Sequence, residues 1–147
     1  MKKRISVIAI LLLVTASLVF IYLRSRESVS SGDLLIRSAN SELTVTVKDL
    51  DLADVHGSIT NKKGETKEIN SKGVALSQLP ALAGVSDFSE ISVYADDEYK
   101  AVLSKEELAS AEKAWLIIAD DNSIRLIVFD DPDSKRDVKN VVKVEIK

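Results

Sequence analysis

The chain has 147 residues, 46% of them hydrophobic and 29% charged, a composition that supports a packed domain rather than a disordered segment. It contains no cysteine, which excludes disulfides, thiolate metal sites and cysteine nucleophiles. Of its 20 basic residues, three precede an apolar stretch at the amino end, and the other 17 stand against 23 acidic residues, a net charge of −6. Scattered acidic charge argues against nucleic acid as a partner.

The amino end carries 19 consecutive uncharged residues, from 5 to 23. A helix of that length measures about 28 Å, close to the thickness of the hydrocarbon core of a bilayer. We therefore expect residues 1–23 to form a signal anchor whose segment 5–23 is a transmembrane helix. A cleavable signal peptide is the alternative, because the small residues around Val14-Thr15-Ala16 suit a cleavage site.

Three basic residues precede the apolar stretch and two follow it. Because basic flanks favour the cytoplasmic side, this difference predicts a single-pass membrane protein with its globular domain outside the cytoplasm. Residues 24–40 are rich in serine and show no sustained period, which predicts a linker. Within it, the segment 33–37 is expected as a short strand or helix packed on the domain.

Alternating apolar and polar residues predict strands from residue 41 onward. Leu43, Val45 and Val47 share one face, which is typical of a half-buried strand. Segments 55–60 and 65–69 predict two further strands, joined by a hairpin turn at 61–64.

The segment 73–85 predicts the central element, a turn glycine, a short helix and a closing glycine. Leucines recur in it at helical spacing. Pro80 lacks an N–H and must lie in the first turn, so Ser77 is the expected N-cap residue and Gly84 the expected residue after the C-cap.

The second half predicts one more helix and four more strands. Ser104 and Glu107 have capping-box spacing, which predicts a helix over 105–113. The expected strands are a hairpin of 90–95 with 99–103, two apolar runs at 115–119 and 124–129 that would form the centre of the sheet, and 141–146 after a charged loop at 130–140. The domain 41–147 is therefore expected to be α+β, a mixed sheet of about eight strands with two short helices.

The order of these elements resembles the oxidoreductase molybdopterin-binding domain family, which has the sulfite-oxidase-type fold. The resemblance covers 43–147 in shortened form. Matching residues in the central helix, the hairpin, the following helix and the last strand are Gly73, Val74, Leu76, Leu79, Gly84, Val85, Asp97, Tyr99, Leu103, Glu107, Leu108, Val138, Lys139, Val141, Lys143, Val144 and Glu145.

The departures from that family decide what the resemblance implies for chemistry. Catalytic members bind molybdenum through a cysteine thiolate, which would fall near 55–60, where this chain has His56, Gly57 and Ser58. Glu98 replaces the glycine of the family's hairpin, and no pterin-phosphate-binding residue matches. We expect no cofactor; molybdopterin is implied by the resemblance alone.

His56 is the only histidine and a candidate for cofactor binding. A Ser–His–Asp unit would require Asp54 and Ser58 to converge on it, which neighbours on one strand do not readily do. The simpler interpretation is an ordinary strand residue. Trp115 opens an apolar run and is more simply a core residue than a binding surface.

Three further residues are candidates for cofactor binding. Ser77 lies where free helical N–H groups would suit an anion, and the simpler interpretation is that it caps the helix. Tyr94 and Tyr99 flank the turn of the 90–103 hairpin.

Acidic clusters recur along the chain, and oxygen-rich loops of this kind can bind calcium. The candidate metal ligands are Asp130, Asp131 and Asp133. None of the clusters matches an EF-hand loop, and solvated turns are the simpler interpretation.

The sequence thus predicts a membrane-anchored extracytoplasmic domain that acts as a non-catalytic binding or accessory module, with a protein partner in the cell envelope. The alternative is an oxidoreductase or redox accessory that holds a pterin-type cofactor without a cysteine ligand. A third reading is a purely structural envelope protein.

Overall fold

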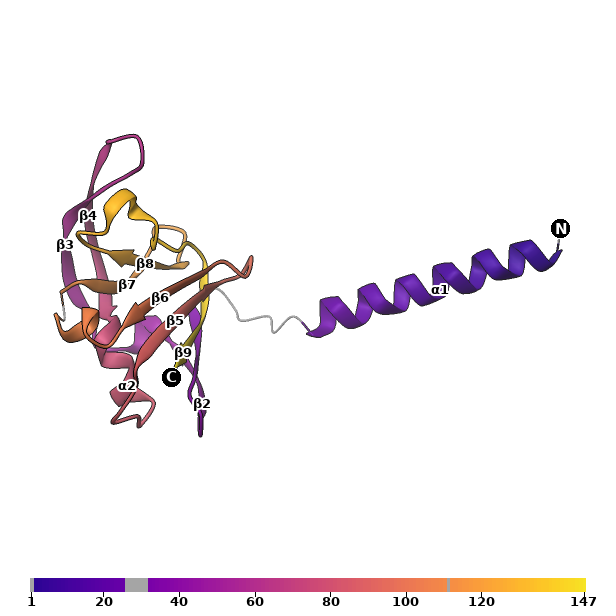
Figure 1. Cartoon of the computed structure of the whole chain (residues 1–147), viewed down its shortest axis with the longest axis horizontal. Coiled ribbons are helices and arrows are strands. Elements are labelled where there is room, and N and C mark those ends of the chain that lie inside the picture. Colours follow the sequence, from indigo (N-terminus) through magenta and orange to yellow (C-terminus); the bar gives the residue numbers. More distant parts are fainter. Residues whose placement is uncertain (1, 26–31, 111) are drawn as a thin grey trace.

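The computed structural model describes residues 2–25, 32–110 and 112–147, with side chains at 7–8, 10–21, 32–110, 112–132 and 134–147. Within these residues it contains two α-helices, α1 (Lys2–Ser25) and α2 (Leu79–Leu82), and four 3-10 helices, η1 (Val47–Asp49), η2 (Leu76–Gln78), η3 (Glu107–Ala109) and η4 (Pro132–Ser134). The strands are β1 (Asp33–Arg37), β2 (Glu42–Thr46), β3 (Ala53–Thr60), β4 (Thr66–Ala75), β5 (Glu90–Ala95), β6 (Lys100–Ser104), β7 (Ala114–Ile118), β8 (Ile124–Val128) and β9 (Val141–Ile146) (Figure 1).

Helix α1 occupies the apolar stretch at the amino end. Its described side chains, at 7–8 and 10–21, are exposed. Across the described residues, no helix combines the length and apolar character needed to cross a membrane. The helix itself is therefore confirmed, while the membrane span stays a prediction.

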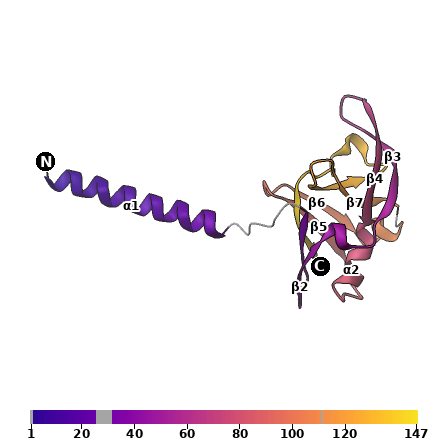
Figure 2. The ribbon, with the colours of Figure 1, turned by 180° about the vertical axis from the view of Figure 1, so that it is seen from behind.

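The strands form two sheets, which confirms the α+β class with nine strands where about eight were expected. The first sheet has the order β2-β1-β9-β5-β6, and the second has the order β3-β4-β7-β8. All pairings are antiparallel except that of β1 with β9. Figures 1 and 2 show the two sheets from opposite sides.

One apolar core is built from residues of both sheets. Alternate residues of β1, β5, β6, β7 and β8 enter it, as expected when one face of a sheet is buried. Its fully buried members include Leu34, Ile91, Leu103, Leu116 and Val144, from β1, β5, β6, β7 and β9.

Strand β1 lies in the segment that the sequence predicts as a linker. It pairs with β2 on one side and β9 on the other, and Leu34 and Ile36 are at most 1% exposed. Of the two expectations for 33–37, the strand is confirmed. These residues belong to the globular fold, which therefore begins before residue 41.

Gly73 does not form the turn that the sequence predicts. It lies within β4, which continues to Ala75, and pairs with Ile117 of β7. A Cβ at this position would overlap the backbone oxygen of Leu116. Glycine is needed here for close approach of two strands rather than for a turn.

The central helix begins later than predicted and ends where predicted. Ser77 is not the N-cap residue: it lies inside η2, and Gln78 occupies the N-cap of α2. The expected glycine cap is confirmed, because Gly84 has a φ of 70°. The N–H of Val85 donates to the oxygen of Pro80 at 2.8 Å, which completes a Schellman motif.

The helix expected over 105–113 is reduced to η3. The capping box forms: the Ser104 N–H donates to Glu107 Oε2 at 3.0 Å, and the Glu107 N–H donates to Ser104 Oγ at 3.3 Å. However, Ser110 has extended backbone angles and β7 begins at Ala114. Local capping therefore starts a turn that the following strand prevents from continuing.

One expectation about strand position is wrong, and the expected inward face of Leu43, Val45 and Val47 is buried fully only at Val47 and in part at Val45. Strand β8 lies at the end of the second sheet rather than at its centre, although its inner face is buried. Strand β2 is a largely exposed edge strand, with Leu43 38% exposed, although Val45 packs against the core.

Glu98 occupies a backbone conformation that favours glycine, with a φ of 68° in the β5–β6 turn. A Cβ in this region costs about 1–2 kcal/mol, partly offset by the flexibility of glycine in the unfolded chain. We expect Glu98→Gly to raise the free energy of unfolding by about 0.5–1 kcal/mol. Urea denaturation measures this. Glu98→Ala removes the same charge but keeps Cβ, so an equal gain in that variant would contradict the account.

Candidate functional site

A second apolar cluster lies on the face of the second sheet that points away from the shared core. Its buried members are Val55, Ile59, Ile69, Ile117 and Ile127. Strands β3 and β8 lie at opposite ends of this sheet, yet both contribute to the cluster. The sheet therefore curls until the β3–β4 hairpin approaches the end of β8.

Two contacts hold the curled hairpin in place. Gly57 of β3 lies so close to the ring of Phe129 that a Cβ would be 2.5 Å from the ring carbon Cε1. Near the hairpin's far end, Ser134 Oγ donates to the backbone oxygen of Thr60 at 2.7 Å.

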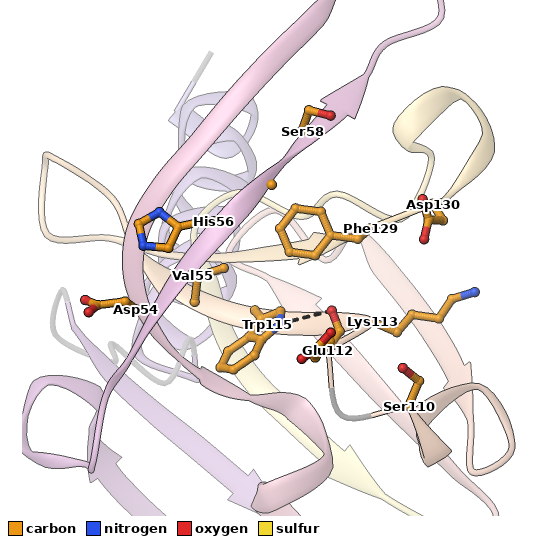
Figure 3. Close-up of a pocket in the computed structure, with 11 residues that line it drawn as sticks. Asp54, Val55, His56, Ser58, Ser110, Glu112, Lys113, Trp115, Phe129 and Asp130 are labelled. Atoms are coloured by element: carbon orange, nitrogen blue, oxygen red, sulfur yellow. Dashed lines mark hydrogen bonds between the residues drawn. The ribbon is translucent and has the colours of Figure 1, made fainter.

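A pocket of about 690 Å³ opens beside β3 at this junction (Figure 3). Its walls are residues 54–58 of β3, Ser110, Glu112, Lys113 and Trp115 before and within β7, and Phe129 and Asp130 after β8. The volume lies within the usual range for small-molecule sites.

Trp115 has a fixed orientation in this pocket. Its indole N–H donates to the backbone oxygen of Glu112 at 3.0 Å (Figure 3). The ring packs against the second cluster and is half-buried, so it serves as both core and pocket wall. From the sequence, Trp115 was interpreted as a core residue only. The sequence does not reveal that the β3–β4 hairpin curls toward the end of β8 and leaves a pocket beside Trp115.

His56 lies in the pocket wall but forms no triad. Its Nδ1 is 2.8 Å from Oδ1 of Asn70, its partner across the β3–β4 pair. Asp54 and Ser58 are spread along the same strand in Figure 3, and no hydrogen bond joins either of them to His56 within the described residues. This arrangement has no nucleophile with an oriented base.

The charges of the pocket are mainly negative. Asp54, Glu112 and Asp130 stand against Lys113, a balance of −2 with His56 neutral. Asp54 Oδ1 lies 3.9 Å from Lys72 Nζ, but both side chains are about 70% exposed. An ion pair that is so exposed to water contributes little to stability.

A half-buried ion cluster forms around Arg136. Arg136 donates to Asp131 Oδ1 and Glu107 Oε1, both at 2.7 Å. The pKa of Glu107 is lowered, first by the hydrogen bond from the Ser104 N–H, then by Arg136, and in smaller part by the charge of Lys113. The side chain of Asp131 is 5% exposed, and its carboxylate is paired with the guanidinium of Arg136.

The structure does not gather the three candidate metal ligands. Asp131 faces Arg136, Asp130 lines the pocket, and the side chain of Asp133 lies outside the described residues. In the part of the chain that is described, no three histidine or acidic side chains are grouped to hold a metal ion.

The other cofactor candidates do not line this pocket, and the two tyrosines among them have partners within the fold. Tyr94 donates to Glu145 Oε2 at 2.9 Å and stacks under Lys143, whose Nζ is 4.2 Å from the ring centroid. Burial, followed by the Glu145 bond, raises the pKa of Tyr94. Tyr99 donates to the oxygen of Lys135 at 2.6 Å, and Ser77 lies in η2.

Comparison with known proteins supports the fold. No protein-family model and no curated protein sequence matches the chain. Among solved structures, the sulfane dehydrogenase SoxCD from Paracoccus pantotrophus is similar, with a TM-score of 0.64 and 15% identity over 81% of this chain and 39% of that chain. The likeness shows the fold alone. It supports a coarse relationship to the sulfite-oxidase-type molybdopterin fold. The match spans about two fifths of the length of the sulfane dehydrogenase chain.

Replacing Gly57 tests the contact that shapes the pocket. In Gly57→Ala the new methyl group must displace the Phe129 ring, and overpacking of this kind costs about 1–3 kcal/mol. Urea denaturation followed by the emission of the single tryptophan measures the loss. Ser58→Ala, at the exposed neighbouring position, is the control. Equal stability of the two variants would contradict the contact.

Proposed function

We propose that this chain is a binding or accessory module built on a sulfite-oxidase-type fold, and that it carries out no molybdenum chemistry. The likeness to the sulfane dehydrogenase structure supports the fold. The observation that carries the non-catalytic role is the composition of β3 where the resemblance places the metal-binding thiolate: His56, Gly57 and Ser58, in a chain without cysteine.

The pocket residues do not fit the family's cofactor. Gly57 offers no side chain and has no room for one beside Phe129, and His56 Nδ1 is engaged by Asn70. The balance of −2 in the pocket would repel the phosphate of a pterin cofactor. No redox step can be derived from these groups.

We also propose that α1 anchors the domain in a membrane, with the domain outside the cytoplasm and a protein partner in the cell envelope. The proposal is supported by the uncharged stretch 5–23, which includes residues whose side chains lie outside the described part, and by the excess of basic residues before it. The large apolar side chains of α1 that are described are 53–69% exposed, which suits contact with lipid.

The alternative function is a redox accessory that holds a pterin-type cofactor without a cysteine ligand. It is favoured by the likeness of fold alone. The charge and the packing of the pocket argue against it, for the reasons given above.

Cofactor analysis separates the two functions. The full chain is purified without denaturation from a host that makes molybdopterin, beside a molybdenum enzyme produced in the same host. We expect neither molybdenum nor a pterin in the protein, while the enzyme contains both. Elemental analysis and mass spectrometry of the denatured supernatant measure this, and a stoichiometric pterin or metal would contradict the non-catalytic role.

Protease treatment of intact cells tests the anchor and its orientation. We expect external trypsin to digest the globular domain while a cytoplasmic marker survives, and the full-length chain to sediment with membranes. A domain that is degraded only after lysis would contradict the orientation. A chain recovered in the soluble fraction would contradict the anchor.

A further inference from the structure

The pocket beside β3 combines aromatic rings with negative charge. Trp115 and Phe129 both line the pocket and pack against the second apolar cluster, and Figure 3 draws Glu112 beside the Trp115 ring. We propose that this pocket binds a small organic cation, an alkylammonium ion whose charge meets the carboxylates and whose carbon atoms contact the rings. The inference rests on the proposed function, since it assigns a ligand class to a pocket that binds without catalysing.

Both rings are held in place before a ligand arrives. The Trp115 indole is tied to the oxygen of Glu112, and the Phe129 ring is confined against Gly57. A cation within about 6 Å of an aromatic ring centroid is attracted by the ring quadrupole, most strongly by tryptophan. Rings that are already oriented lose little conformational freedom on binding.

Lys113 also lines the pocket, but within the described part of the chain it forms no ion pair with the pocket carboxylates. Among the described residues, neither Glu112 nor Asp130 is paired with a lysine or arginine. Lys113 extends away from the rings in Figure 3, and its charge also acts on Glu107, whose carboxylate pairs with Arg136. A ligand that brings a positive charge therefore meets carboxylates that lack a cation.

Other ligand classes fit less well. The balance of −2 disfavours phosphates and carboxylates. A bare metal ion would need several converging ligands, and no such group exists among the described side chains. A volume of about 690 Å³ with two aromatic walls suits a cation that carries its own carbon atoms.

The chain contains one tryptophan, so its emission reports on this pocket directly. The full-length chain in detergent micelles is titrated with butyltrimethylammonium chloride. We expect a saturable change in Trp115 emission. In Glu112→Gln and Asp130→Asn the dissociation constant should rise by about threefold or more in each, as expected for loss of a nearby charge partly exposed to water.

Three controls decide the outcome. Glu106→Gln makes the same change at an exposed position outside the pocket and should bind as the original chain does. The neutral isostere with carbon in place of nitrogen, and sodium phosphate at equal ionic strength, should leave the emission unchanged. Circular dichroism melts confirm that each variant is folded.

An equal response to the neutral isostere, no saturable response, or unchanged affinity in both pocket variants would overturn the cation site. None of these results would bear on the proposed function, which is tested by the search for bound molybdenum and pterin. A bound pterin would overturn the proposed function whether or not the ammonium ion binds.

Discussion

The structure depends on a narrow seam between two strands that lie far apart in the sequence. Strands β4 and β7 pair over three positions, and at the first of them Gly73 faces Ile117. The missing side chain lets the backbone of Leu116 approach closely. This seam joins the β3–β4 hairpin to the rest of the second sheet and fixes the direction in which the hairpin curls. The pocket and the second apolar cluster both depend on the approach of the hairpin to the end of β8.

Features set by neighbouring residues could be predicted from the sequence. The hairpins, the capping box of Ser104 and the glycine cap at Gly84 all depend on contacts within a few residues, and all are present. Predictions failed where distant pairing decides the outcome. The strand β1 looks like part of a linker until β9 pairs with it, and Gly73 looks like a turn until β7 lies against it.

The site was harder to predict than the fold, because its parts come from three separate segments. His56 was singled out as the only histidine, but its partner is Asn70 across the hairpin. Glu112 gave no signal in the sequence, since its backbone oxygen and not its carboxylate orients Trp115. Asp130 was considered as a metal ligand, whereas its position at the end of β8 places it in an acidic, aromatic-walled pocket. The lack of cysteine was the one feature bearing on function that composition alone revealed, because it excludes a thiolate ligand.

The curled hairpin brings the backbone of Gly57, which has no side chain, against the ring of Phe129. Proton NMR of the protein tests this contact most directly. The account predicts that an α-proton of Gly57 is shifted upfield by the ring current of Phe129 and shows nuclear Overhauser effects to that ring. An ordinary strand shift for Gly57 without any such effect would show that the hairpin does not fold back, and would contradict the account.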